Sequence, residues 1–208
     1  MSEIKISVAG PQDAEELLEI YAPYVRDTAV SFEYTVPSPE EFRQRIIHTL
    51  EKYPYLKAEK DGEVVGYAYA GPLHPRAAYA WSVETSIYVK KDKKHLGIGK
   101  LLYDTLEKIL KEQNILSVNA CIAWPEKEDE YLTGDSVRFH EHMGYRKVAE
   151  FHKCACKFGR WYNMVWMEKH IGVHSDNPAE IKKPARGGLW LAGEKLSVRR
   201  RRAGVHRP

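Results

Sequence analysis

Two glycines in a short basic segment are the first residues of this sequence whose spacing points to chemistry. Gly97 and Gly99 lie between a lysine-rich turn and an amphipathic stretch that is predicted to be helical. The first turn of a helix presents unpaired N–H groups and the positive end of the helix dipole, and glycine puts no side chain between backbone and ligand. Such a helix start binds phosphate groups. The spacing is neither G-x-G-x-x-G nor a Walker A loop, and many helices follow a glycine without binding anything, so this segment alone indicates only an anion site.

Glu84 is the acidic residue best suited to proton transfer. It lies inside the mostly apolar stretch 82–89, three residues after Trp81. Burial raises the pKa of a carboxylate, and a carboxylate with a raised pKa is an effective proton acceptor. The alternative is a strand that is half exposed, with Glu84 facing solvent. We expect the catalytic role.

The histidines and cysteines do not form a metal-binding pattern. His140 and His142 are two residues apart in a predicted short helix, so they do not share a helix face. Cys154 and Cys156 lack a second pair of ligands, and with Cys121 they make a sparse, odd set. We therefore expect three free thiols in a reducing cytoplasm and no metal cofactor.

The elements that must position these residues follow from the hydropathy pattern. Period-two alternation and turn residues predict strands, and apolar stripes with capping residues predict helices. Pro23 is expected to bend the first helix before a second short segment. Together these elements predict a single α+β domain built around a central sheet. Strands are expected at 4–8, 55–59, 63–69, 81–89, 116–122, 147–152 and 162–168, and helices at 11–21, 38–52, 97–113 and 135–142.

The charge is divided unevenly along the chain. Residues 173–208 hold nine Lys/Arg and three Asp/Glu, which leaves 23 basic and 26 acidic residues in 1–172. We therefore predict a mildly acidic domain over 1–172 and a basic, flexible extension over 173–208. An acidic domain is a poor general nucleic-acid binder, and no apolar run is long enough to span a membrane. Neither nucleic acid nor membrane is an expected partner.

Several short motifs occur together, in one order, between about residues 4 and 169. The main one is the loop from Lys94 to Gly99. On these motifs the sequence resembles the GNAT acetyltransferase superfamily, and within it the phosphinothricin acetyltransferase-like branch. The other matching segments are 53–56, 66–72, 83–89, 136–141, 144–145 and 157–161.

The resemblance implies a fold and a cofactor. The fold would be the GNAT type, a mixed, mostly antiparallel central sheet flanked by helices, and the co-substrate would be acetyl-CoA. The main chain of Ile87, Tyr88 and Val89 would bind the acetyl carbonyl and the pantetheine arm. Thr133 stands where relatives often have an asparagine that contacts the cofactor, and Ser136 follows it. The diphosphate would lie on Lys94, His95, Leu96, Gly97, Ile98, Gly99 and Lys100.

The resemblance also implies catalytic and substrate-binding roles. Glu84 would be the general base, and His140 would replace the tyrosine that protonates the coenzyme A thiolate in many GNAT enzymes. Transfer would be direct, in a ternary complex, to the amino group of a small amino-acid-like substrate of the phosphinothricin or methionine sulfoximine type. A guanidinium suits the carboxylate of such a substrate. Residues expected to line this acceptor pocket, unless they only pack or face solvent, are Phe32, Tyr34, Arg76, Tyr79 and Trp81.

Two other functions stay open from the sequence alone. One is acetylation of a protein or peptide amine, which an open acidic groove would favour. The other is a cofactor-bound regulatory or interaction module whose basic tail, Arg199 to Arg202, contacts an acidic partner. The family resemblance implies a homodimer, but no segment indicates the interface, and the identity of the amine is not specified.

Overall fold

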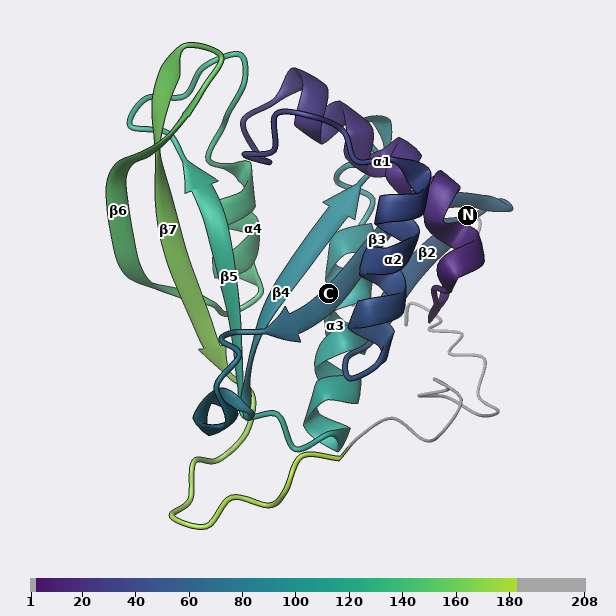
Figure 1. The fold of residues 1–208 in the computed structure, drawn as a ribbon, viewed down its shortest axis with the longest axis vertical. Helices are drawn as coiled ribbons and strands as arrows, with labels where there is room; N and C mark the ends of the chain where they lie inside the picture. Colours follow the sequence, from purple (N-terminus) through teal and green to yellow (C-terminus); the bar gives the residue numbers. More distant parts are fainter. Residues whose placement is uncertain (1–2, 183–208) are drawn as a thin grey trace, which may run out of the picture.

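A computed structural model describes residues 3–182 and shows one seven-stranded sheet in the order β1-β2-β3-β4-β5-β7-β6 (Figure 1). Every neighbouring pair is antiparallel except β4 and β5, which are parallel. The prediction of a mixed, mostly antiparallel sheet is therefore confirmed. The strands are β1 (Ile4–Val8), β2 (Tyr55–Lys60), β3 (Glu63–Pro72), β4 (Ser82–Val89), β5 (Ser117–Trp124), β6 (Arg146–Lys157) and β7 (Arg160–His170).

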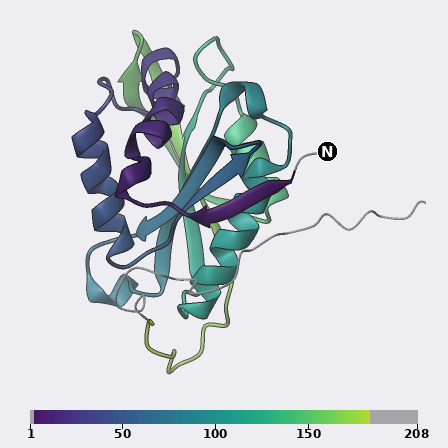
Figure 2. The same cartoon turned by 90° about the vertical axis from the view of Figure 1, so that its right-hand side faces the viewer.

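Helices cover both faces of the sheet. In Figures 1 and 2, α1 (Ala14–Asp27) and α2 (Pro39–Leu50) lie on one face, and α3 (Ile98–Glu112) and α4 (Asp135–His142) lie on the other. Each face buries its own apolar cluster, one around Leu17 and Tyr67 and the other around Leu102 and Leu106. None of the helices within residues 3–182 is long and apolar enough to cross a membrane.

Local sequence signals explain most element ends. Asp61 and Gly62 adopt positive φ angles of 55° and 82° in the β2–β3 turn, as the predicted hairpin requires. The Ser38 hydroxyl accepts a hydrogen bond from the Glu41 N–H at 3.1 Å and caps α2. Gly144, with a φ of 87°, follows the end of α4.

Pro23 does not bend the chain as predicted, because α1 continues through it to Asp27. The proline removes one helix hydrogen bond, but the helix buries Tyr21, Tyr24 and Val25 on either side of it. Burial of those side chains outweighs the lost bond, a balance that depends on tertiary packing.

The segment after β7 departs from the prediction of a flexible extension from residue 173. Residues 173–182 run beneath the lower ends of β4, β5 and α3 in Figure 1 and are bonded to them. The Lys182 N–H, for example, donates to the Gln113 carbonyl at 3.0 Å. The rest of the predicted basic extension, 183–208, lies outside the described residues.

Candidate functional site

The sheet opens into a fork between β4 and β5. These two strands pair only at 82–84 with 117–119, and after Glu84 they diverge, β4 staying with β3 and β5 with β7. The backbone groups of β4 beyond Glu84 that would have paired with β5 therefore face the opening. The splayed strand implied by the sequence resemblance is present at this point (Figure 1).

A pocket passes through this fork from one face of the sheet to the other. Side chains alternate along β4, so Ser86 and Tyr88 face α1, whereas Thr85 and Ile87 face α3 and α4. Both sets line the pocket, which therefore connects the two faces. Its lining residues are Val30, Thr85, Ser86, Ile87, Tyr88, Tyr103, Ala120, Cys121, Ile122, Ala123, Leu132, Ser136 and His140.

Glu84 lies at the closed end of the fork, on the same face as Tyr88. Its side chain is half-buried, and burial raises the pKa of its carboxyl group above the ordinary 4.5. Within residues 3–182 no hydrogen bond or ion pair engages this carboxylate, so no donor or cation offsets the burial. A carboxylate in this state takes up a proton more readily than a surface glutamate does.

His140 lies on the opposite side of the pocket and is buried. Its Nδ1 is 2.7 Å from the Ser136 carbonyl oxygen, which can only accept, so Nδ1 carries the proton. Its Nε2 is 3.0 Å from the Tyr103 hydroxyl and therefore accepts from it. Burial lowers the pKa of His140 to about 4. At neutral pH the imidazole is uncharged and has no proton on Nε2, which weighs against direct proton donation by His140 itself.

Tyr103 is a site residue that the sequence reasoning missed. It was part of a predicted amphipathic helix, where an aromatic side chain indicates packing. In the structure its hydroxyl reaches both the pocket lining and His140, and burial raises its pKa well above the ordinary 10. Gly99 and Tyr103 are four residues apart, so they share one face of α3. This spacing was the only sequence signal that Tyr103 lies near the site.

The predicted anion-binding loop is at the start of α3. Gly97 is the N-cap residue with a φ of 80°, and no side chain caps the first turn, so its N–H groups remain available. His95 also has a positive φ of 64°. Ile98 is buried in the core, so only its main chain can face a ligand. The loop has the backbone geometry that a phosphate site requires.

The second glycine of that loop has a packing reason. A Cβ at Gly99 would lie 3.1 Å from the Phe139 ring of α4, closer than side-chain atoms normally approach. Gly99 therefore lets α3 and α4 pack closely. Lys100 also has a partner, since its Nζ is 2.7 Å from Asp104. Lys94 and Leu96 are exposed beside them.

Comparison with known proteins identifies the family. The model of the acetyltransferase (GNAT) domain matches residues 6–166. A phosphinothricin N-acetyltransferase from Streptomyces coelicolor is 33% identical over 174 residues, covering 82% of this chain and 98% of that protein. The chain belongs to the GNAT acetyltransferase family. The resemblance inferred from the sequence motifs is confirmed.

Two solved structures extend the comparison of this GNAT acetyltransferase. A phosphinothricin acetyltransferase from Sinorhizobium meliloti in complex with acetyl-CoA has a TM-score of 0.76 and 26% identity, covering 91% of this chain and all of that chain. A ribosomal-protein-alanine N-acetyltransferase from Brucella melitensis has a TM-score of 0.72 and 29% identity, covering 79% and 98%. Both support the GNAT fold.

The residues predicted to bind the acceptor are divided between two places in this acetyltransferase. Phe32 and Tyr34 lie in the loop between α1 and α2, where Phe32 is 6.4 Å from the Tyr162 ring and the Tyr34 hydroxyl donates to the Cys156 carbonyl. Arg76 and Tyr79 lie exposed in the β3–β4 loop, outside the residues that line the pocket.

Trp81 has a different contact from the one predicted. Its indole Nε1–H donates to the Ala179 carbonyl at 2.8 Å, so its polar edge faces the segment after β7. The pocket lining does not include it. A contact of Trp81 with the acceptor stays a prediction; what the structure adds is its bond to a segment that the sequence predicted to be flexible.

Three loops meet at the open end of the fork, on the side of α1. Loop 125–134 accepts a hydrogen bond here, from the Ala29 N–H to the Tyr131 carbonyl at 3.0 Å. The Tyr131 ring stacks on Phe158 of the β6–β7 turn at 4.3 Å. Arg160 is 2.9 Å from Asp129. These contacts give the acceptor side of the pocket a fixed rim.

Lys157 joins two of these loops. Its side chain is buried, and its Nζ donates to the carbonyls of Val25 at 2.8 Å and Ser31 at 2.6 Å. Burial lowers the pKa of this ammonium group. Lys157 thereby ties the end of α1 and the loop carrying Phe32 to the β6–β7 turn. Nothing in the sequence distinguished it from a surface lysine.

The two residues at the start of α4 that were predicted to contact the cofactor differ in their surroundings. Ser136 lines the pocket, and its contact with the cofactor stays a prediction. Thr133 is exposed, and its hydroxyl accepts from the Asp135 N–H at 3.5 Å. The cysteines at 121, 154 and 156 are unpaired, and within residues 3–182 no three His, Cys, Asp or Glu side chains group around a metal-sized position.

Proposed function

We propose that this acetyltransferase transfers the acetyl group of acetyl-CoA to the amino group of a small amino-acid-like acceptor, by direct attack in a ternary complex. The observation that carries the proposal is Glu84, a half-buried carboxylate without a counter-charge at the closed end of a fork. The anion-binding start of α3 lies on one side of that fork, and the rim with Phe32 lies on the other. Cofactor and acceptor thus approach from opposite faces.

The proposed reaction begins with proton removal. Glu84 accepts a proton from the substrate ammonium group, directly or through water, which leaves a neutral amine. The amine nitrogen attacks the thioester carbonyl, and N–H groups of β4 at 87–89 hold the oxyanion. The C–S bond then breaks, giving the amide and the coenzyme A thiolate. The second amine proton passes to solvent, the thiolate takes a proton from the Tyr103 hydroxyl, and exchange with solvent returns Glu84 and Tyr103 to their starting forms.

We propose that Tyr103 and His140 act as a pair at the departing sulfur. At rest the Tyr103 hydroxyl donates its one proton to the neutral His140 Nε2, 3.0 Å away, which fixes the position of the hydroxyl. A developing thiolate is a new anion in a buried pocket, and the hydroxyl exchanges its bond to Nε2 for one to the sulfur as this charge builds up. His140 is then a positioning residue.

Cofactor binding is assigned to the start of α3 and to the fork. The diphosphate lies on the N–H groups after Gly97, with Lys94, His95 and Lys100 as nearby cations. The pantetheine arm passes through the pocket between β4 and β5, alongside Ser136. No step of the proposed reaction requires a metal or an acetylated cysteine.

A free amino acid or analogue is the preferred acceptor class. The named relatives from Streptomyces and Sinorhizobium act on phosphinothricin, a small amino-acid analogue. The rim of three bonded loops narrows the acceptor side around Phe32 and Tyr162. Arg76 is exposed in the β3–β4 loop. Its guanidinium binds the acceptor carboxylate when that loop closes on the acceptor.

A protein N-terminal amine is the second candidate acceptor, because one structural relative is named a ribosomal-protein-alanine N-acetyltransferase. A test of both is coenzyme A release with a panel of free amino acids, phosphinothricin, methionine sulfoximine and peptides that begin with alanine. Turnover with free amino acids or analogues, and none with peptides, supports the proposal. Turnover with the peptides alone would show that the acceptor is a protein N-terminal amine instead. If the protein acetylates no amine in the panel, the proposed function is rejected.

Three broader expectations from the sequence are retained as proposals. We propose a homodimer, which the long edge strand β6 with exposed Val148 and Phe151 suits. We also propose a cytoplasmic location and a catalytic domain that includes 1–172. Analytical ultracentrifugation at several protein concentrations tests whether the protein is a homodimer.

A further inference from the structure

A ten-residue segment crosses the closed end of the fork. Residues 173–182, called the C-terminal strap here, follow β7 and pass below the lower ends of β4 and β5 (Figure 1). Trp81, the residue before β4, donates from Nε1 to the Ala179 carbonyl at 2.8 Å. Ser117, the first residue of β5, is bonded through its hydroxyl to His174 Nε2 at 3.1 Å. The strap is therefore bonded to both strands of the fork.

The parallel pairing between these strands is short. It covers only three residues on each strand, 82–84 and 117–119. The Leu116 and Ser117 N–H groups add two bonds to the Trp81 carbonyl, at 2.9 and 3.1 Å. Two side-chain bonds lie beside them, from the Asn119 amide to the Val83 carbonyl and from the Thr85 hydroxyl to the Asn119 carbonyl, both at 3.1 Å. Glu84 is the last residue of β4 that pairs with β5, so a small change in strand spacing here moves Glu84 relative to β5.

The strap has its own attachment to the body of the domain. The Asn114 side-chain amide donates to the Glu180 carbonyl at 2.6 Å, and the Lys182 N–H donates to the Gln113 carbonyl at 3.0 Å. Ile181 packs on the core beside α3. With both ends attached, the strap can resist separation of the two strands between them.

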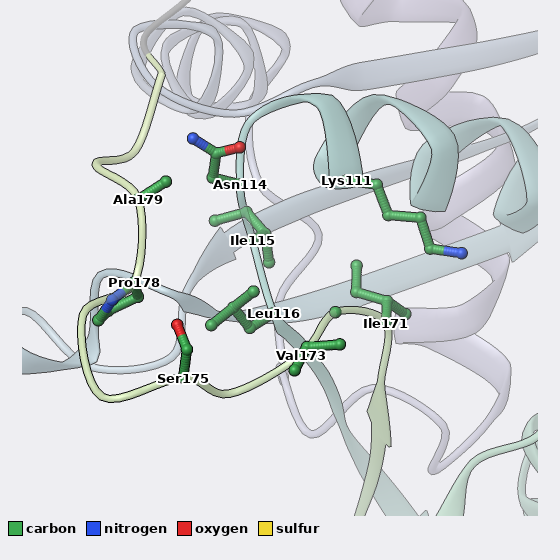
Figure 3. A pocket seen from close by; sticks show the side chains of 10 residues that line it. Lys111, Asn114, Ile115, Leu116, Ile171, Val173, Ser175, Pro178 and Ala179 are labelled. Carbon is green, nitrogen blue, oxygen red and sulfur yellow. The ribbon is translucent and has the colours of Figure 1, made fainter.

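Hydrogen bonds, rather than close apolar packing, hold the middle of the strap. A partly open groove of about 210 Å³ lies between the strap and the body, lined by Ile115, Leu116 and Ile171 on one side and Val173, Pro178 and Ala179 on the other (Figure 3). The apolar side chains on its two sides therefore make few contacts with each other there. The bonds to Trp81 and Ser117 are therefore the connections by which the strap acts on the fork.

We infer that the C-terminal strap is a positioning segment of the transfer site: it clamps the first residues of β4 and β5 together and so sets the place of Glu84. This inference rests on the proposed function of Glu84. No strap residue lines the fork pocket, so the strap acts through the strands and not by touching substrate.

The test uses the full-length chain with two variants. Trp81→Phe keeps an aromatic ring and removes the Nε1 donor, and a second variant replaces 173–182 by ten Gly and Ser residues. The matched control is Asp176→Asn, at an exposed strap residue. For both variants we expect kcat to fall about tenfold, since small misplacements of catalytic groups are costly. The KM for acetyl-CoA should change less than twofold, because its phosphate loop lies at the other end of β4.

Hydrogen exchange gives a second readout that needs no turnover. The Leu116 and Ser117 amides should exchange faster in both variants than in the native chain and the control, whereas amides of α3 should not. Native kcat and native exchange in both variants would overturn the inference. An equal loss across kcat, KM and melting temperature would also overturn it, because that pattern means general destabilisation. If the native chain itself turns over no amine, the proposed function fails, while exchange still decides whether the strap clamps the strands.

Discussion

Glu84 and the Tyr103–His140 pair show how environment assigns roles to single residues. The same fork holds a carboxylate whose pKa is raised by burial and an imidazole whose pKa is lowered by burial. Both shifts favour the neutral form. His140 lines the pocket, and Glu84 lies next to its lining residue Thr85, at the closed end of the fork. A base and a hydroxyl-orienting group in these places match the proton transfers that amide formation needs.

Glu84→Gln tests the base. The variant keeps the shape and removes the proton acceptor, so we expect kcat to fall by roughly two to four decades, the scale of acid–base catalysis. The deprotonated carboxylate is the active form, so native kcat/KM should rise with pH through a pKa above 4.5, and this limb should disappear in the variant. Calorimetry should show unchanged acetyl-CoA affinity. A variant with native turnover would remove Glu84 from the mechanism.

Tyr103→Phe tests the hydroxyl that we propose to act at the departing sulfur. It removes the donor to His140 Nε2 and keeps the ring, so we expect kcat to fall about 10- to 100-fold with little change in the KM for acetyl-CoA. Tyr145→Phe is the control, because its hydroxyl is bonded to Thr85 and not to His140. Equal effects of the two substitutions in steady-state assays would contradict a specific role for Tyr103.

At the scale of elements, the start of α3 combines an N-cap glycine with the proposed phosphate site. Gly97→Ala places a Cβ at a φ of 80°, which costs about 1–2 kcal/mol and crowds the phosphate loop. We expect acetyl-CoA binding by calorimetry to weaken at least tenfold. Gly62→Ala is matched to it, with a φ of 82° in the β2–β3 turn and open space around it. Gly62→Ala should therefore lose a similar amount of stability but keep the native affinity for acetyl-CoA. If both variants bind acetyl-CoA more weakly, backbone strain alone explains the loss.

The loop between α1 and α2 depends on one buried cation. Lys157→Met leaves the Val25 and Ser31 carbonyls without a donor, at about 1–3 kcal/mol each. Because that loop carries Phe32, the KM for the amine should rise more than the KM for acetyl-CoA. Lys153→Met, at an exposed position on the same strand, is the control. Steady-state assays with each substrate varied in turn check this, and an equal rise in both KM values would contradict it.

At the scale of the whole molecule, His140 links stability to pH. Its folded-state pKa is about 4, against an ordinary 6.5, so between those values the unfolded chain binds a proton that the folded chain does not. Stability should therefore fall as pH drops from 6.5 to 4, by roughly 3 kcal/mol from this group. The free energy of unfolding, measured with urea across this pH range, should depend less on pH in His140→Gln than in the native protein. The exposed His48→Gln should follow the native curve, and parallel curves for all three proteins would contradict the assignment.

The amino-acid sequence determined the order of the elements, the turn at Asp61 and Gly62, the cap at Ser38 and the anion-binding helix start at Gly97. Each of these depends on residues close together in the chain, through periodicity, backbone conformation or a local hydrogen bond. The motifs also indicated the family, and Glu84 was identifiable because an acid within an apolar strand is unusual.

Only the tertiary structure decided what depends on distant partners. Pro23 stays inside α1 because of what the helix packs against, and Tyr103 belongs to the site because α4 brings His140 to its hydroxyl. Lys157 is an anchor because it meets carbonyls more than 120 residues away in the chain. Trp81 is bonded to the C-terminal strap, which the sequence did not predict, because the ten strap residues find their hydrogen-bond partners only on the folded domain.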